Sequence, residues 1–450
     1  MSDIFIDFEK TPNGWLLSSI DDFANVIMGQ SPPSETYNED EIGLPFFQGK
    51  AEFTELHPIV RKWCDSPNKI AEPYDILLSV RAPVGATNIA NVKCCIGRGL
   101  AAIRYPQCNR FLFYFFRLIE KKLDEKGTGT TFRAISGDVI KNAKIFLPPL
   151  PEQHRIVAKI EELFSSLDKG IESLKTARQQ LKVYRQAVLK WAFEGKLTNK
   201  DVKDGELPAG WVSKRVNEIA FVNPKLPFEN ISNDLEVSFL PMKLVEEVIN
   251  KINLIEIRKY GEVKKGFTPM TDGDVIFAKI TPCMENGKIA IVHSLKNHIA
   301  FGSTEFHVFR CKDGILNSYL FHFLVQESTR QEAERNMTGA VGQRRVPKKF
   351  LEELVIPIPP TLDEQHLIAS EIESRLSVCD KIEESISTAL QQSEALRQSI
   401  LKKAFEGKLV PQNPGDEPAS MLLERIRVER ETILKTTKRT SKQRRNKQLK

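Results

Sequence analysis

The alternation of apolar and polar residues predicts two long helices of the same design. Between residues 152 and 197, and again between 364 and 409, apolar side chains recur every three or four positions. This spacing gathers them into one stripe along an α-helix. Prolines precede each stretch, and Gly195 and Gly407 follow, which predicts where each helix starts and ends. About 43 helical residues would reach roughly 65 Å.

The two stretches are copies of one sequence. A constant offset of 212 residues aligns them without a gap, and 25 of the 46 positions are identical. A narrow stripe of this length needs a partner, and its own duplicate is the nearest complementary one. We therefore expect an antiparallel intramolecular coiled coil that acts as a rigid spacer. The alternatives are that each helix packs on its own domain or pairs between chains. The stripe positions expected to serve as spacer and partner-docking residues are Ile156, Ile160, Leu163, Ile368, Ile372 and Leu376.

The longer segments that precede the helices also share a frame. Each opens with the pattern P-x-G-W, at residues 12–15 and 208–211, and each ends in a proline-rich exit. The runs 75–81 and 274–280 follow a turn and are strand-like, and an aromatic-rich helix is expected later in each segment. Repetition of a whole unit predicts an internal pseudo-two-fold axis.

We therefore predict an α+β protein, because 450 residues exceed what one hydrophobic core usually fills. Two globular domains of mixed strands and helices would be joined by the two long antiparallel helices. The expected divisions are a first domain at 1–150, a first spacer helix at 151–198, a linker and second domain at 199–362, a second spacer helix at 363–410, and a C-terminal helix with a basic tail at 411–450.

Composition favours a reduced cytoplasmic protein. No apolar run approaches the roughly 20 residues that span a bilayer, and the acidic start does not resemble a signal peptide. The seven cysteines form no C-x-x-C pair, so we expect buried thiols and no metal site. The net charge of +6 is concentrated at the C-terminus, because residues 425–450 carry +9. We expect the end of this tail to be a disordered basic arm that adds salt-sensitive phosphate binding.

Motifs for catalysis are missing from the sequence. The segment 31–34 (SPPS) lacks the aromatic residue of the N/D-P-P-Y/F motif of adenine methyltransferases, and 261–266 lacks the lysine of a phosphate-binding loop. We predict no catalytic residue, no bound cofactor and no metal in this chain.

Loops in both segments carry residue types suited to DNA. The loop GTGTTFR at 127–133 offers glycines for close approach, threonines for phosphates and an arginine for a guanine edge. Its counterpart at 338–345 ends in Gln-Arg-Arg, and Arg81 and Lys279 follow matching strand-like runs. The DNA-binding candidates are Arg81, Arg98, Thr130, Arg133, Lys279, Gln343, Arg344 and Arg345; solvated surface residues are the alternative.

These features together resemble the specificity (S) subunit of type I DNA restriction–modification systems. The resemblance is carried by PPLPEQHRIVAKIEELF and PPTLDEQHLIASEI at the helix starts, AFEGKL at both helix ends, the two P-x-G-W openings, GQSPPSETYN and DILLSVRAPVG. It covers nearly all of residues 11–435.

The resemblance implies that each domain is a target-recognition domain that reads one half of a gapped site in double-stranded DNA. The helices would set the gap and dock two methyltransferase (M) subunits, and restriction (R) subunits would join for cleavage. S-adenosylmethionine, ATP and Mg²⁺ would be bound by those partners. A self-contained nuclease or methyltransferase with diverged motifs is the alternative, and a purely protein-binding adaptor is a third hypothesis that leaves the globular segments without a task.

Overall fold

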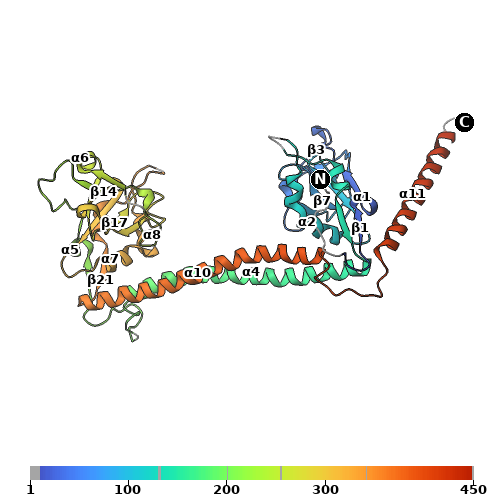
Figure 1. The fold of residues 1–450 in the computed structure, drawn as a ribbon. Coiled ribbons are helices and arrows are strands. Elements are labelled where there is room, and N and C mark those ends of the chain that lie inside the picture. The colour runs from blue at the N-terminus through green and yellow to red at the C-terminus, as the bar shows by residue number, and fades with distance from the viewer. Residues whose placement is uncertain (1–10, 130–132, 200, 254–255, 341, 448–450) are drawn as a thin grey trace. The chain divides into compact units, whose positions relative to one another are not determined.

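The protein divides into two compact units, one formed by residues 1–173 and 389–450 and the other by residues 174–388. A computed structural model describes residues 11–129, 133–199, 201–253, 256–340 and 342–447. The repeated helices are α4 (Leu150–Phe193) and α10 (Leu362–Phe405), and each contributes one part to each unit (Figure 1). We describe the units separately, as unit 1 and unit 2.

Unit 1 holds two main sheets and a separate strand pair. The four-stranded sheet has the order β2 (Asn25–Met28), β10 (Leu100–Arg104), β7 (Ile76–Ser79), β8 (Thr87–Ile89). The five-stranded sheet has the order β3 (Tyr37–Asn38), β5 (Trp63–Cys64), β4 (Leu44–Phe47), β9 (Cys94–Ile96), β6 (Ile70–Ala71). The pair is β1 (Leu16–Ser19) with β11 (Lys144–Leu147). Neighbouring strands are antiparallel except β4 and β9, which are parallel.

Unit 2 repeats this topology strand for strand, except that its described residues form no counterpart of β3. One sheet has the order β13 (Ala220–Val222), β20 (Phe306–Cys311), β17 (Val275–Ala278), β18 (Ile289–Ile291). The other has the order β15 (Glu256–Lys259), β14 (Glu236–Leu240), β19 (Ile299–Gly302), β16 (Thr268–Thr271), with β14 and β19 parallel. The separate pair is β12 (Val212–Arg215) with β21 (Val355–Ile358). The duplication predicted from the helices therefore extends through both domains.

Helices of 3 to 17 residues connect these strands. In unit 1 they are α1 (Ile20–Phe23), η1 (Ser34–Thr36), η2 (Lys50–Glu52), α2 (Asn109–Glu125) and α3 (Gly137–Lys141). In unit 2 they are α5 (Val216–Ile219), η3 (Met242–Leu244), α6 (Tyr260–Val263), η4 (Lys296–His298), α7 (Asn317–Leu324), α8 (Glu327–Arg335) and α9 (Lys348–Glu353).

An aromatic helix forms the centre of each core. In unit 1, α2 buries every residue from Phe111 to Phe116, and the rings of Phe111 and Phe115 lie 4.9 and 5.5 Å from the ring of Phe405 at the end of α10. In unit 2, Phe193 at the end of α4 lies 4.9 Å from the Tyr319 ring of α7. The phenylalanine of each AFEGKL segment therefore anchors a long helix in a domain core.

The P-x-G-W openings attach each domain to the start of a long helix. Trp15 Nε1 donates to Glu152 Oε2 at 3.0 Å, and Trp211 Nε1 donates to Glu364 Oε1 at 2.9 Å. Burial raises the pKa of Glu152, which the bond from Trp15 partly offsets. The adjacent Gln153 accepts from the Tyr105 hydroxyl at 2.9 Å and donates to a backbone carbonyl. The Glu-Gln pair repeated at both helix starts therefore holds helix and domain in a fixed orientation.

The C-terminal end of each long helix lies against one of the same P-x-G-W segments. Gly195 and Gly407 adopt left-handed φ angles of +72° and +69°, which other residues seldom adopt. A Cβ at Gly195 would also lie 2.2 Å from Pro208, and one at Gly407 would lie 2.7 Å from Pro12. Each domain is therefore joined to one helix start and one helix end.

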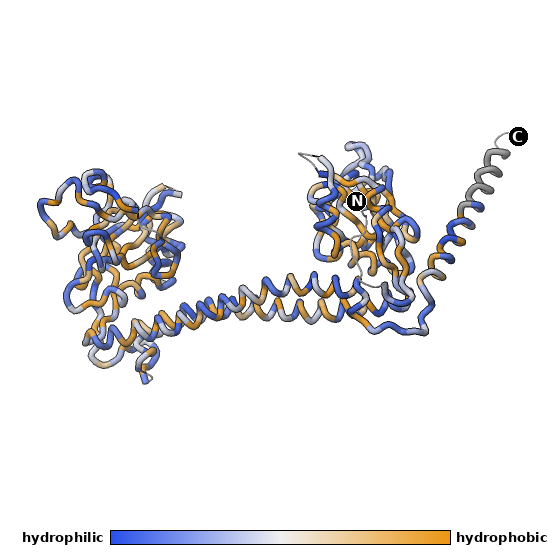
Figure 2. The backbone as a smooth tube through the Cα atoms, in the orientation of Figure 1, coloured by the Kyte–Doolittle hydropathy of each residue, from blue (hydrophilic) through white to orange (hydrophobic). Residues whose placement is uncertain are grey.

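The two long helices pack against each other, and apolar residues alternate with polar ones along both (Figure 2). In unit 2, Arg185 of α4 pairs with Asp380 of α10 at 2.6 Å. In unit 1, Arg397 of α10 pairs with Asp168 of α4, the equivalent positions at the 212-residue offset. In both units the partners run in opposite directions, as expected for the antiparallel pair.

All six predicted spacer residues lie in or against the cores of the domains. Ile156 and Ile160 are fully buried in the core of unit 1, and Ile368 and Ile372 are fully buried in that of unit 2. Leu163 and Leu376 are partly buried against the same cores. Another protein could reach the isoleucines only by displacing the domain. The alternative in which each helix packs on its own domain thus holds for the helix starts.

The C-terminal helix α11 (Ala419–Lys447) belongs to unit 1. Ala419, Leu422 and Ile426 are buried in that unit's core, and Arg430 donates to the backbone carbonyls at the end of α1 at 2.6 and 2.9 Å. The expectation of a disordered arm is wrong as far as Lys447, because the sequence beyond Ala419 contains neither glycine nor proline to end the helix.

Candidate nucleic-acid interface

In unit 1, three loops that carry the predicted DNA-binding residues meet at one edge. The Val80 amide donates to the Gly99 carbonyl at 2.9 Å, which joins the end of β7 to the turn before β10. The Ala82 amide donates to the Arg133 carbonyl at 2.9 Å, which joins the first loop to the one after α2. We call residues 80–82, 97–99, 128–129 and 133–134 the first edge. Its arginines, Arg81, Arg98 and Arg133, are all exposed.

Unit 2 repeats this arrangement. The Lys279 amide donates to the Glu305 carbonyl at 2.9 Å, and the Thr281 amide donates to the Arg344 carbonyl at 3.2 Å. We call residues 279–281, 303–305, 338–340 and 342–345 the second edge. Gln343 is exposed, whereas Lys279, Arg344 and Arg345 are partly exposed. The structure thus gathers the predicted residues of each domain at equivalent places. Thr130 lies outside the described residues.

The hydrogen-bond pattern fixes which positions of the two edges correspond. Arg81 forms an isolated bridge with Ala134, and Ile280 forms the equivalent bridge with Arg345. The counterpart of Arg81 is therefore Ile280, one residue beyond the Lys279 with which the sequence pairs it. By the same pattern, the counterpart of Glu305 is Gly99.

The arginines differ in how they are held. Arg345 Nε and Nη2 donate to the two carboxylate oxygens of Glu305 at 2.9 and 2.8 Å, and this pairing holds the pKa of Glu305 below its usual range. The other contacts are looser: Arg344 lies 3.7 Å from Glu334, and Arg133 lies 3.5 Å from Asp124. Only Arg345, among these arginines, is clamped by two parallel bonds in the described part of the chain.

Backbone crowding shapes the first edge. A Cβ at Gly99 would lie 2.4 Å from the Gln48 carbonyl oxygen, and one at Gly29 would lie 2.2 Å from the Gly97 carbonyl oxygen. Both distances are shorter than real Cβ contacts allow, so each position requires glycine. The glycines flanking Arg98 therefore let three chain segments approach closely and leave the arginine side chain in solvent.

Comparison with known proteins identifies the repeated unit. A family model described as the type I restriction modification DNA specificity domain matches residues 12–182 and 208–392. The chain belongs to this family. Each match contains one globular domain and most of the long helix that follows it, so the sequence resemblance is confirmed.

Individual relatives of the chain are specificity subunits of type I restriction enzymes. The chain is 37% identical over 283 residues to the EcoAI specificity subunit of Escherichia coli, and 34% identical over 321 residues to the EcoEI specificity subunit. These alignments cover 53% and 62% of this chain and 47% and 52% of those relatives, so the chain matches about half of their length. The EcoKI specificity subunit of E. coli K12 is 25% identical over 94% of this chain and 96% of its own.

Two solved structures share the fold. The HsdS subunit of Thermoanaerobacter tengcongensis has a TM-score of 0.58 at 20% identity, and covers 89% of this chain and 98% of its own. A chain from a structural study of assembly and conformational transition in a type I R-M system has a TM-score of 0.67 at 19% identity, over 89% of this chain and 99% of its own.

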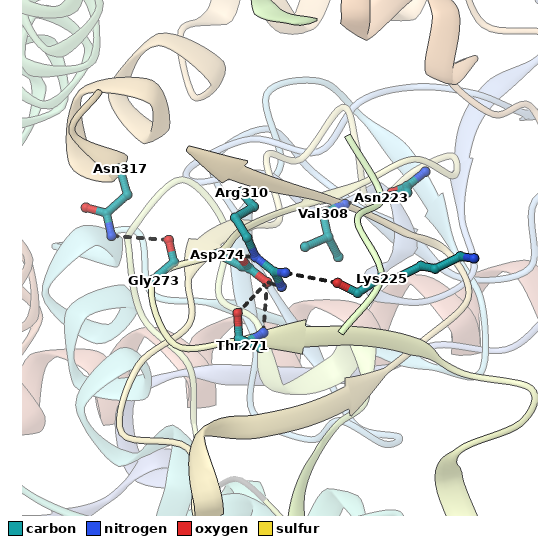
Figure 3. Close-up of polar contacts among 8 residues, drawn as sticks. All are labelled: Asn223, Lys225, Thr271, Gly273, Asp274, Val308, Arg310 and Asn317. Carbon is teal, nitrogen blue, oxygen red and sulfur yellow. Dashed lines mark hydrogen bonds and ion pairs between the residues drawn. The ribbon is translucent and has the colours of Figure 1, made fainter. Parts of the chain in front are cut away.

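An ion pair between a buried aspartate and a partly exposed arginine supports the edge of each specificity domain. Asp274 precedes β17, and both of its carboxylate oxygens accept from Arg310 of β20 at 2.8 and 2.7 Å (Figure 3). The same carboxylate accepts the Thr271 amide, which closes the turn into the strand. In unit 1, Asp75 and Arg104 form the equivalent pair at 2.9 and 2.7 Å. The pair fixes the two strands whose far ends carry the edge loops.

Sequence reasoning missed one polar residue beside the first edge and one in the second edge. Gln48 is exposed directly after β4, and its carbonyl accepts the Gly99 amide at 3.1 Å. The parallel strands β4 and β9 end together, so a polar residue after a buried aromatic pair was the available signal. The second is Glu305, for which the sequence offers no local signal, because its partner lies 40 positions away.

The described residues of the specificity domains give no support for metal binding or for a membrane span. No group of three or more His, Cys, Asp or Glu residues that could hold a metal occurs in the described residues. Burial raises the pKa of the Cys94 and Cys311 thiols to about 12, so neither is a ready nucleophile. In the same part of the chain, no helix is long and apolar enough to cross a membrane.

Proposed function

We propose that this chain is the DNA-sequence-recognition subunit of a type I restriction–modification complex. Each domain reads one half of a bipartite, gapped site in double-stranded DNA through its edge. The observation that carries this proposal is one backbone frame built twice, with different polar side chains on equivalent edges. Two readers of different sequences need a common scaffold and divergent contacts, because base edges differ in their donors and acceptors.

The long helices set the gap and, with the surrounding surface, dock two methyltransferase subunits; restriction subunits join for cleavage. Family membership supports the partners, and the antiparallel ion pairs Arg185–Asp380 and Arg397–Asp168 support a rigid spacer. The chain performs no chemistry itself. S-adenosylmethionine, ATP and Mg²⁺ are bound by the partner subunits, and the basic helix α11 adds contacts to phosphates.

The test is modification in cells followed by mapping of the methylated bases. Co-expressed with its methyltransferase subunit, the chain should direct methylation to one bipartite motif with a fixed gap. The purified chain alone should neither methylate nor cleave DNA. Insertion of one helical turn between residues 175 and 182, about 5.4 Å, should change the gap by one to two base pairs or abolish methylation. Methylation by the chain without partners would reject the assignment, and an unchanged gap after the insertion would reject the spacer role.

A further inference from the structure

Arg345 is the most constrained DNA-binding candidate on either edge. A guanidinium carries five N–H groups. In Arg345, Nε and Nη2 each donate to Glu305, and Nη1 donates to the Gln343 carbonyl at 3.0 Å. One N–H remains free on each terminal nitrogen, and 43% of the side chain is exposed. The group is therefore held in place and still has two donors to offer.

These two donors suit one base. Guanine presents O6 and N7 side by side in the major groove, and a pair of N–H groups from one arginine fits both acceptors. A freely rotating arginine loses side-chain entropy when it makes such a contact. Arg345 has already lost much of that freedom, because Glu305 and the Gln343 carbonyl hold it from two directions.

The carboxylate of Glu305 also disfavours the simpler alternative, a phosphate contact. It lies beside the guanidinium and cancels much of its charge, which weakens attraction to a fully charged phosphate. Neutral base acceptors depend more on the direction of the donors than on net charge. Glu305 therefore shifts the preference of Arg345 from the backbone toward a base edge.

Among the described residues of the first edge, no arginine is held by a carboxylate in this way. The position of Glu305 is occupied by Gly99, where the Gln48 carbonyl leaves no room for a side chain, and the position of Arg345 is occupied by Ala134. In the part of the chain that the structure describes, the clamped edge arginine thus occurs only in the second domain.

We propose that Arg345 reads a guanine in the half-site bound by the second domain, and that Glu305 is a positioning residue that orients it. This inference rests on the proposed function and makes it specific. Its test uses the full chain with its methyltransferase subunit, and a library of duplexes randomised at every position of the wild-type methylated motif.

The first variant is Arg345→Lys, which keeps the positive charge and loses the fork. One guanine in one half-site should lose its preference over the other bases by roughly 5- to 150-fold, with the other positions unchanged. Arg335→Lys, at an exposed arginine of α8 outside the second edge, is the matched control and should leave that preference intact. If Arg345→Lys and Arg345→Ala leave all base preferences unchanged, or if they weaken all sequences alike with a shallower salt dependence, Arg345 contacts a phosphate or no DNA and the inference is overturned.

The second variant is Glu305→Gln, which keeps the shape and removes the charge. The guanine preference should fall, while binding to unrelated DNA stays the same or rises because a negative charge has been removed. A merely structural role would instead lower both together with the melting temperature. If the wild-type complex selects no motif at all, both the proposed function and this inference are rejected. If it selects a bipartite motif that Glu305→Gln leaves unchanged, the positioning role alone fails.

Discussion

The two edges share their backbone and differ in their side chains. Each is closed by an amide-to-carbonyl bond of 2.9 Å, from Val80 to Gly99 in the first edge and from Lys279 to Glu305 in the second. At the bridge between loops, the arginine stands on opposite sides: Arg81 faces Ala134, whereas Ile280 faces Arg345. The two edges therefore share their main-chain bonds at positions where their side chains differ.

The residues that hold each domain together are, in contrast, the same in both units. The Asp–Arg pair before the edge, the tryptophan bound to a helix-start glutamate, and the phenylalanine at each helix end occur in both units with closely similar geometry. Each of these satisfies a buried polar group or fills a core, so its replacement would disturb the whole domain. This contrast between a shared frame and free edges can be tested at matched positions.

The largest change in the free energy of unfolding is expected when the ion pairs of Asp75 and Asp274 are broken. Asp75→Ala and Asp274→Ala should each lower the free energy of unfolding of their own unit by about 3 kcal/mol, because each leaves an arginine without its carboxylate. The carboxylates are 2% and 1% exposed, and the arginines 32% and 24%, so the two losses should be similar. Hydrogen exchange of β7 and β17 during denaturant titration measures each unit separately.

The exposed residues Asp40 and Asp313 provide controls, and their replacement by alanine should be nearly neutral. Clearly unequal losses at Asp75 and Asp274 would show that the frames of the two units are not energetically equivalent.

Gly99 and Glu305 occupy equivalent positions of the two edges. Their replacement by alanine should lower the free energy of unfolding by smaller and unequal amounts. Gly99→Ala should cost about 1–3 kcal/mol, because its Cβ would press against the Gln48 carbonyl. Glu305→Ala removes a partly exposed ion pair with Arg345 and should change the unfolding free energy by about 1 kcal/mol or less. Denaturant titration of both variants gives the comparison. A neutral Gly99→Ala would mean that crowding is not what keeps side chains out of the first edge.

The sequence predicts the frame better than the edges, for a physical reason. Helix periodicity and the 212-residue repeat are local patterns, and they locate α4 and α10 to within a few residues. The strand-like runs after Asp75 and Asp274 are β7 and β17, because short apolar runs after a turn are also local signals. The clamp on Arg345 depends instead on a glutamate brought close by the sheet. For the same reason the correspondence of Arg81 with Ile280 becomes visible only through the hydrogen-bond pattern.

The smallest expected effect is a loss of protection against hydrogen exchange at low pH, at the second edge and not at the first. His307 of β20 is buried; its Nδ1 lies 3.0 Å from the Asn223 amide nitrogen and its Nε2 lies 2.9 Å from the Val346 carbonyl oxygen. The neutral ring satisfies both, accepting at Nδ1 and donating at Nε2. Burial lowers the pKa of His307, and the hydrogen bond to Val346 partly offsets this shift. Lys279 and Lys348 lower the pKa further, and Glu305 opposes them.

Because the folded state holds this proton less tightly than the unfolded state, the contribution of neutral His307 to stability is complete above a pH of about 6.5 and declines as the pH falls below it. Amides of 338–340 and 342–346 should therefore lose protection against hydrogen exchange below that pH, after correction for intrinsic exchange. The first edge has Ala101 at the equivalent strand position and should keep its protection. His307→Gln, which retains a donor for Val346, should remove the difference; if both edges loosen alike in the wild-type chain, the sensitivity does not arise from His307.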